Sequence, residues 1–209
     1  MYKPIEINYE WTSLEPHIGA NTLWIHYNKY YLKYLGKLNE ILAKYNFDFN
    51  TSKEYLLSHI NEIPNEIKEK VLLYLGGILN HELYFMNLSD KKNNKFCDEF
   101  KNAINKNFNN YEEFKKIFIS NANSVIGSGY THLVINSRLE FEIVNTSNHV
   151  LPQSYGFIPI ITMDVFEHSY FLDYQYRKDE YFEAFFEVID YEKVNNIYVN
   201  IIKNKSYLS

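Results

Sequence analysis

The chain has 209 residues, 46% of them hydrophobic, and a formal net charge of -5. This composition predicts a globular protein with a sizeable core, and no cluster of lysine or arginine is interleaved with aromatic residues as in DNA- or RNA-binding proteins. No apolar run is long enough to predict a membrane-spanning helix. The single Cys97 and a start without a signal-peptide core favour a cytoplasmic protein.

Three helices are expected in the N-terminal half. Apolar residues at helical spacing predict one long helix over residues 20–44. Residues 51–54, Thr-Ser-Lys-Glu, form a capping-box pattern that opens a short second helix, and a third helix is expected over residues 64–87. Two long helices joined by a short helical excursion predict an antiparallel hairpin. Such a hairpin can bring His26 and His81 side by side.

A polar segment, residues 87–95, separates this hairpin from the rest of the chain. We therefore expect an N-terminal domain, residues 1–89, and a C-terminal domain, residues 90–209. Helices, then strands, then helices indicate an α+β domain with a three-stranded antiparallel sheet. The expected helices cover about residues 96–107, 111–125, 178–189 and 191–203, a further helix starts at 170–174, and the expected strands cover 130–136, 139–145 and 157–165.

The last expected strand ends in candidate metal ligands. Residues 158–161 are apolar, and Asp164 and His168 follow where the chain turns toward a helix. An aspartate oxygen and a histidine nitrogen four residues apart suit iron, manganese or zinc. Since two ligands rarely hold such an ion, more are expected upstream. His26 and His81 are candidates, although an isolated histidine in an apolar helical pattern is more often a core residue than a ligand.

The segments around these four residues resemble the iron/manganese superoxide dismutases, and the order and spacing of the matching segments make the resemblance specific. The matching segments are Leu14 to Ile18, His26 to Tyr34, Asn80–His81, Gly127 to Val134, Ile143 to Asn148, and Asp164 to His168. The resemblance implies one iron or manganese ion per chain, bound by His26, His81, Asp164 and His168. It also implies the conversion of superoxide to dioxygen and hydrogen peroxide.

Further roles follow from the same resemblance. Tyr34 matches the gateway tyrosine that relays protons. Glu167 matches a carboxylate that reaches the last histidine ligand of the partner chain, which implies a homodimer, with pairing to a tetramer left open. Lys29 and Lys178 match cations near the substrate funnel, where a local positive field can offset the repulsion between a negative protein and superoxide.

Several aromatic positions depart from the family pattern. Phe166 and Tyr130 stand where relatives usually carry tryptophan. Tyr30 replaces a histidine four residues past the first ligand, and Phe171 replaces the tyrosine that pairs with that histidine across the dimer. A hydrogen-bonded pair is therefore expected to be exchanged for an aromatic pair, and reduced turnover is one expected consequence.

His149 is the most informative departure. In relatives a glutamine bonds the metal-bound solvent, either from the helix position that is Gly77 here or from the loop position that is His149 here. The missing side chain at Gly77 is expected to leave room for His149 to take that role. An imidazole there would make activity more sensitive to pH, and we expect a metal preference that is relaxed or leans to iron.

Two other functions are left open by the sequence. The altered surroundings of the site are compatible with a metal-binding structural or interaction protein of the same fold that has lost activity. A non-redox metal hydrolase with Glu167 or Glu82 as its base is the weaker alternative, because the ligand set is one that redox metals occupy.

Overall fold

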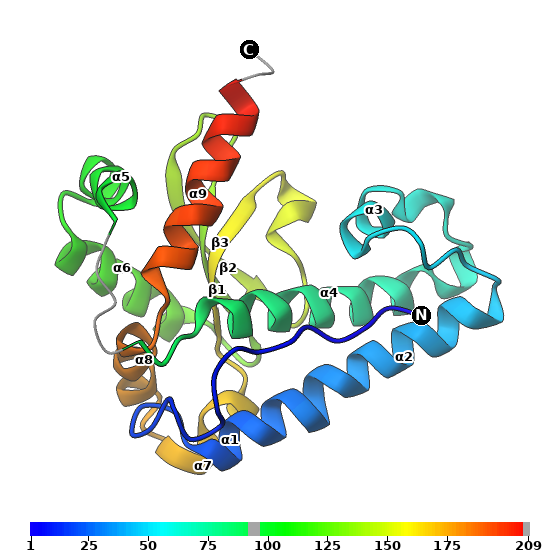
Figure 1. Ribbon diagram of the computed structural model, residues 1–209, viewed down its shortest axis with the longest axis horizontal. Helices are drawn as coiled ribbons and strands as arrows, with labels where there is room; N and C mark the ends of the chain where they lie inside the picture. Colours follow the sequence, from blue (N-terminus) through cyan, green and yellow to red (C-terminus); the bar gives the residue numbers. More distant parts are fainter. Residues whose placement is uncertain (92–96, 207–209) are drawn as a thin grey trace.

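The computed structural model describes residues 1–91 and 97–206 and consists of two parts (Figure 1). The N-terminal part is a long helical hairpin, and the C-terminal part is a three-stranded sheet with helices packed around it. The predicted α+β class, with a helical hairpin followed by an antiparallel three-stranded sheet, is confirmed.

The first long helix covers the predicted residues but contains a wide turn. It comprises α1 (Ala20–Ile25), the π-helical segment η1 (His26–Tyr31) and α2 (Leu32–Lys44). In a π-helix, hydrogen bonds span five residues instead of four, an arrangement that is rare and often occurs at functional sites. The prediction of one uninterrupted α-helix is wrong for this turn, because apolar spacing does not resolve a change of less than one residue per turn. His26 is the first residue of the wide turn.

The short second helix, α3 (Lys53–Ser58), begins one residue later than the capping pattern predicted. Ser52 rather than Thr51 is the N-cap, since its Oγ accepts a hydrogen bond from the backbone N of Tyr55 at 3.0 Å. The Thr51 hydroxyl instead donates to the carbonyl of Asp48 at 3.1 Å.

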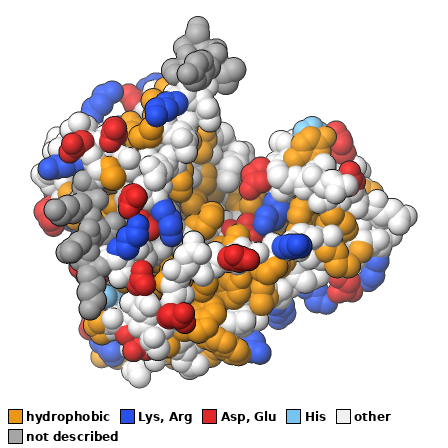
Figure 2. Space-filling model, in the orientation of Figure 1, with side chains coloured by type: hydrophobic (Ala, Val, Ile, Leu, Met, Phe, Trp, Pro, Cys, Tyr) orange, Lys and Arg blue, Asp and Glu red, His pale blue; other side chains and the backbone are white. Residues whose placement is uncertain are grey.

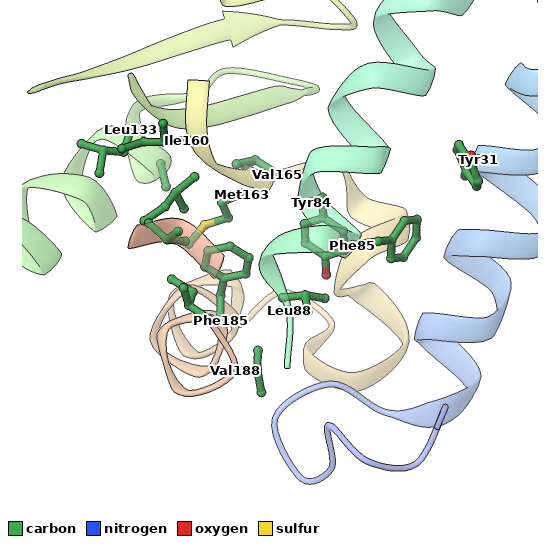
Figure 3. Packing of buried hydrophobic residues seen from close by; sticks show 14 of the residues in the cluster. Tyr31, Tyr84, Phe85, Leu88, Leu133, Ile160, Met163, Val165, Phe185 and Val188 are labelled. Atoms are coloured by element: carbon green, nitrogen blue, oxygen red, sulfur yellow. The ribbon is translucent and has the colours of Figure 1, made fainter. Parts of the chain in front are cut away.

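The third helix, α4 (Asn65–Asn87), joins the two parts in one core. It packs against α2 on one side and against the strand β3 (Ile158–Asp164) on the other. Figure 3 shows two of its buried side chains: Tyr84, whose ring stacks on that of Phe185 in the C-terminal part, and Phe85, whose ring lies 5.0 Å from that of His26 in the first helix. Because apolar side chains of both parts are buried in a single cluster, the hydrophobic effect holds the hairpin against the sheet.

The sheet has the strand order β2-β1-β3, with β1 (Gly129–Ile135) antiparallel to both β2 (Phe141–Ser147) and β3. β2 begins two residues later than predicted. Leu139 has a φ of 63°, a left-handed turn conformation that a strand residue does not adopt. The side chain of Asn136 accepts hydrogen bonds from two backbone N–H groups of this turn, which is therefore longer than the two residues predicted.

The other elements surround the sheet and the far end of the hairpin (Figure 1). They are η2 (Ile60–Glu62), α5 (Asp98–Phe108), α6 (Tyr111–Ser124), η3 (Pro152–Tyr155), η4 (Glu167–Ser169), α7 (Phe171–Tyr174), α8 (Lys178–Glu187) and α9 (Tyr191–Ser206). The start predicted near residue 96 for the first of these α-helices, and residues 92–95 of the predicted boundary segment, lie outside the described residues.

Residues 1–91 and 97–206 contain no helix that is both long and apolar enough to cross a membrane. On the face shown in Figure 2, basic and acidic side chains are interspersed, and hydrophobic side chains gather over the hairpin.

Candidate metal centre

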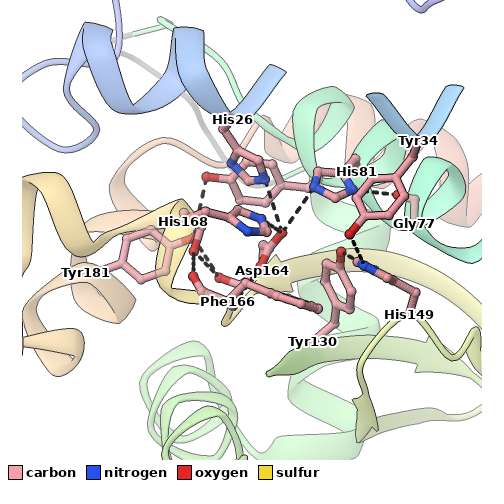
Figure 4. A network of polar contacts seen from close by, with 12 residues as sticks. His26, Tyr34, Gly77, His81, Tyr130, His149, Asp164, Phe166, His168 and Tyr181 are labelled. Atoms are coloured by element: carbon pink, nitrogen blue, oxygen red, sulfur yellow. Dashed lines mark hydrogen bonds and ion pairs between the residues drawn. The ribbon is translucent and has the colours of Figure 1, made fainter. Parts of the chain in front are cut away.

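Four candidate ligands converge where the hairpin meets the end of β3 (Figure 4). His26 comes from η1, His81 from α4, Asp164 from the end of β3 and His168 from η4. One ligand atom of each lies within 4.8 Å of the other three. The Nε2 atoms of His26, His168 and His81 lie 3.1, 3.3 and 3.7 Å from Oδ2 of Asp164. The structure thus brings together all four residues that the sequence predicted as ligands.

Asp164 is fixed by hydrogen bonds to both its side chain and its backbone. Its Oδ1 accepts a hydrogen bond from the backbone N of Phe166 at 2.8 Å. Its carbonyl accepts from the hydroxyl groups of Ser169 and Tyr181 at 2.9 and 3.0 Å. Because Oδ1 is engaged, Oδ2 is the carboxylate oxygen presented to the three imidazoles.

The protonation of His81 is set by its own helix. Nδ1 of His81 donates to the carbonyl of Gly77 at 2.5 Å, so Nε2 is the bare nitrogen of the neutral ring. Among the described residues, this buried Nε2 has no hydrogen-bond partner. Its lone pair faces the Asp164 carboxylate, and two electron-rich atoms facing each other in a buried site are stabilised by a cation between them. The donor set therefore fits a metal ion.

Burial sets the charge of the site. It lowers the pKa of His26 to about 4 and lowers the pKa of His81 well below its ordinary value. For Asp164, burial alone would raise the pKa, but the neighbouring His168 and His26 outweigh it, and the pKa of this carboxyl lies below its usual range. At neutral pH the Asp164 carboxylate therefore lies beside the neutral imidazoles of His26 and His81, which is the protonation state that metal binding requires of these residues.

Beside this cluster, the ring of His149 is bonded at both nitrogens. Its Nε2 lies 2.7 Å from the hydroxyl of Tyr34, and its Nδ1 lies 3.2 Å from the hydroxyl of Tyr130. Each ring nitrogen can make only one hydrogen bond in the plane of the ring. In this structure a tyrosine hydroxyl occupies each of these two positions. The expected bond from His149 to a metal-bound solvent would require one of these contacts to break, and it stays a prediction.

Two adjacent glycines of α4 make this arrangement possible. A Cβ at Gly76 would lie 2.0 Å from the carbonyl oxygen of His149, and a Cβ at Gly77 would lie 3.0 Å from the ring of Tyr34. The space expected at Gly77 is therefore filled by Tyr34, and the room for His149 comes from Gly76. Gly76 was not predicted as a site residue, although two adjacent glycines inside a helix are unfavourable and could have signalled a close approach.

Aromatic rings cover the open side of the cluster. Tyr30 stacks on His168 with ring centroids 4.0 Å apart, and Phe166 stacks on His168 at 5.0 Å and on His149 at 4.8 Å. The predicted aromatic pair of Tyr30 and Phe171 across a dimer stays a prediction. Tyr30 remains 37% exposed, so it lies at the boundary between the site and solvent.

Four predicted residues lie away from the cluster. Lys29 places its ammonium 5.0 Å above the ring of Trp24, and Lys178 lies 3.5 Å from the carbonyl of Asn123, so their funnel role stays a prediction. Glu167 and Phe171 are both exposed in the single chain and stay predictions for the dimer interface.

Glu82, the other predicted base of a hydrolase, is also engaged outside the cluster. Its carboxylate accepts hydrogen bonds from Lys53 at 2.5 Å and from Tyr31 at 2.7 Å. The hydrolase alternative therefore lacks a free base in Glu82.

Comparison with known proteins agrees with this geometry. Residues 1–89 match the α-hairpin domain of the iron/manganese superoxide dismutases, and residues 97–197 match the C-terminal domain of the same family. A curated relative, the superoxide dismutase (Mn) of Listeria monocytogenes, is 35% identical over 194 residues, which cover 93% of this chain and 96% of the relative. All four converging residues lie within the matched segments. The chain therefore belongs to the iron/manganese superoxide dismutase family and is a superoxide dismutase.

Proposed function

We propose that this chain dismutates superoxide with one iron or manganese ion held by His26, His81, Asp164 and His168. The observation that supports the proposal most directly is the bare Nε2 of His81, buried and turned toward the Asp164 carboxylate at 3.7 Å. Held there, an iron or manganese ion would supply the one-electron chemistry by which one superoxide is oxidised to dioxygen and a second superoxide, with two protons, is reduced to hydrogen peroxide.

The residues around the ligands prepare this chemistry. The backbone of α4, through Gly77, holds His81 in the tautomer that exposes Nε2. Burial keeps His26 neutral, and the neighbouring histidines keep Asp164 ionised, so its carboxylate supplies a negative charge that offsets part of the charge of the ion. The rings of Tyr30 and Phe166 both stack on the imidazole of His168 and so help to orient this candidate ligand.

Tyr34 is the residue that we propose as the proton carrier. Its hydroxyl is bonded to His149, and its ring lies 5.7 Å from that of His81, so it stands beside the candidate ligands. Burial raises the pKa of Tyr34, which keeps the hydroxyl protonated at neutral pH and available as a donor. His149 supports this role as the partner that orients the hydroxyl.

The identity of the metal and the assembly are finer proposals. We propose a relaxed or iron-leaning metal preference, because an imidazole, rather than the carboxamide described above for relatives, partners Tyr34.

We also propose a homodimer in which Glu167 of each chain reaches His168 of the other. Exposed Trp24 of α1 and Phe171 of α7 support this, since these helices lie close together (Figure 1) and would lose exposed apolar surface on pairing. A domain boundary near residues 89–90 and a cytoplasmic location stay predictions.

The test combines metal content with superoxide consumption. Protein loaded separately with iron and with manganese should bind one ion per chain and consume superoxide in a stopped-flow assay. Asp164→Asn and His81→Gln should lose most of the metal and the activity, because three remaining ligands hold the ion poorly. His59→Gln, at a histidine bonded only near α3, is the matched control and should keep both.

Two outcomes would contradict this proposal. Metal-loaded protein with no activity would favour the structural or interaction protein over the enzyme. Full metal occupancy in both ligand variants would contradict the proposed ligand set.

A further inference from the structure

Tyr181 of α8 lies against the turn that carries two of the candidate ligands. This turn comprises residues 164–170, with Asp164 at its start and His168 near its end. Tyr181 is buried, and its hydroxyl donates a hydrogen bond to the carbonyl of Asp164 at 3.0 Å (Figure 4). Its ring stacks on that of Tyr170, with centroids 5.4 Å apart and planes inclined by 24°. One side chain from outside the turn therefore contacts both of its ends.

The backbone of Asp164 depends on such a contact. β3 is an edge strand, and Asp164 is its last residue, so hydrogen bonds to a neighbouring strand hold this backbone from one side only. The chain then enters η4, a segment of three residues. The close approach of Oδ2 of Asp164 to Nε2 of His168, at 3.3 Å, therefore relies on hydrogen bonds from outside the strand.

Two hydroxyl groups lie against the carbonyl of Asp164, and they are not equivalent. The hydroxyl of Ser169 lies 2.9 Å from this carbonyl and 2.7 Å from the carbonyl of Phe166. Because a hydroxyl has a single proton, Ser169 donates to one of the two at a time. Among the described residues, Tyr181 has the Asp164 carbonyl as its one acceptor within the usual range, since the hydroxyl of Tyr84 lies at 3.4 Å. Of the two donors, Tyr181 is also the one that belongs to another element.

We propose that Tyr181 is a positioning residue for the metal site. Its hydroxyl fixes the backbone of Asp164 and its ring supports the turn at Tyr170, so Asp164 and His168 keep the spacing that binds one ion. Tyr181 acts through these ligands and supplies no ligand atom itself. The proposal rests on the ligand set proposed above and adds to it a residue of α8.

The two hydroxyl groups give unequal expectations. Tyr181→Phe keeps the stacked ring and removes the hydroxyl. Ser169 can then bond the carbonyl of Asp164 only by leaving that of Phe166, so the turn loses a hydrogen bond in either case. Ser169→Ala leaves Tyr181 on Asp164, and the carbonyl of Phe166 keeps its hydrogen bond from the backbone N of residue 169 at 3.0 Å. We therefore expect the tyrosine variant to loosen the metal and the serine variant to have little effect.

Tyr174→Phe is the matched control. The hydroxyl of Tyr174 also donates to a backbone carbonyl, that of His17 at 2.6 Å, and the substitution also keeps the ring. His17 is not a candidate ligand, so the loss of this hydrogen bond should leave the metal site unchanged. If Tyr181 had only a structural role, the two phenylalanine variants would behave alike at the metal.

The experiment uses cobalt(II) as the probe, because its visible absorption spectrum depends on the number and arrangement of its ligands. Each protein is loaded with cobalt, its spectrum is recorded, and release of the ion is followed by transfer to an excess of a chelator. Tyr181→Phe should change the spectrum and release cobalt about tenfold faster than the unsubstituted protein. Tyr174→Phe and Ser169→Ala should keep both the spectrum and the release rate close to those of the unsubstituted protein.

An unchanged spectrum and release rate in folded Tyr181→Phe would overturn the proposal. Release from Ser169→Ala that is about tenfold faster would also overturn it, because Ser169 would then be the residue that holds Asp164. If Tyr181→Phe does not fold, the serine variant still decides. Unsubstituted protein that binds no cobalt would contradict the proposed ligand set and this proposal with it, whereas bound cobalt with equal release from all variants would count only against the role of Tyr181.

Discussion

The ring of Tyr30 is stacked on the ring of His168, with centroids 4.0 Å apart and planes inclined by 24°. Phe166 stacks on the same imidazole, at 5.0 Å and 25°. His168 comes from the short segment η4, in which backbone packing constrains a side chain less than it does inside a long helix. The two rings therefore restrict the rotation of this candidate ligand.

Removal of the Tyr30 ring should loosen the metal. Tyr30→Ala is expected to release the bound ion about tenfold faster, because partners that orient a ligand typically contribute ten- to hundredfold to metal affinity. Tyr30→Phe keeps the stack and is the control, with release close to that of the unsubstituted protein. The release rate is measured by transfer of the metal to an excess of a coloured chelator. Equal rates for the alanine and phenylalanine variants would show that the stack does not hold the ligand.

The four candidate ligands could be predicted from the sequence, but the contacts around them could not. Asp164 and His168 are four residues apart at the end of an apolar run, a local pattern, and His26 and His81 are placed by matching motifs. The bond between Tyr34 and His149 joins residues 115 positions apart, and no local pattern specifies such a contact. It depends on how the loop that carries His149 packs on α4.

The differences in the fold have the same origin. Gly76 is required only because the carbonyl of His149 approaches it in three dimensions. The late start of β2 follows from the left-handed conformation of Leu139, a residue type that seldom adopts it. The wide turn that begins at His26 changes the number of residues per helical turn only slightly, and the spacing of apolar residues does not reveal so small a change.

A nearly buried ion pair between Lys53 of α3 and Glu82 of α4 should contribute to stability. Their side chains are 14% and 7% exposed, and Tyr31 also donates to the carboxylate. Lys53→Met would leave that carboxylate without its cation, and the free energy of unfolding should fall by about 3 kcal/mol. The measurement is urea denaturation of metal-free protein, so that metal binding at His81 does not contribute.

The matched control is Lys91→Met. Lys91 pairs with Glu192 at 2.9 Å, but both side chains are more than half exposed, so the expected loss is below about 1 kcal/mol. Equal losses for the two variants would mean that the pair with Glu82 is no more important than a surface pair.

Glu167 should control assembly. In a symmetric dimer each substitution removes two contacts at once, because the same residue acts from both chains. Glu167→Ala should therefore raise the dissociation constant of the dimer, by roughly tenfold or more, and lower metal retention at His168. Sedimentation velocity over a dilution series measures the first effect. The control is Glu180→Ala, at an exposed residue of α8 that pairs with Arg177. A monomeric unsubstituted protein at micromolar concentration would exclude the dimer.

His132 should make stability depend on pH. This buried ring lies in β1 between two hydroxyl groups, with Nδ1 2.8 Å from Thr162 and Nε2 3.0 Å from Thr146. Burial lowers the pKa of His132 from 6.5 to about 3, although the charge of Asp164 acts in the opposite direction. The folded state therefore keeps the imidazole neutral over a range in which the unfolded chain binds a proton.

The sign of the effect follows from proton binding. Above pH 6.5 neither state is protonated at this residue, and stability does not depend on its titration. Between pH 6.5 and about 3 the unfolded state binds more protons, so the free energy of unfolding falls as the pH falls, by up to about 5 kcal/mol for this residue. The control is His132→Gln, which can bond both threonine hydroxyls and does not titrate. Urea denaturation of both metal-free proteins between pH 7 and pH 4 isolates His132, because His26, His81 and His149 titrate in both. The difference in unfolding free energy between the two proteins should shift in favour of the glutamine variant as the pH falls, whereas parallel curves would show that His132 does not carry the predicted shift.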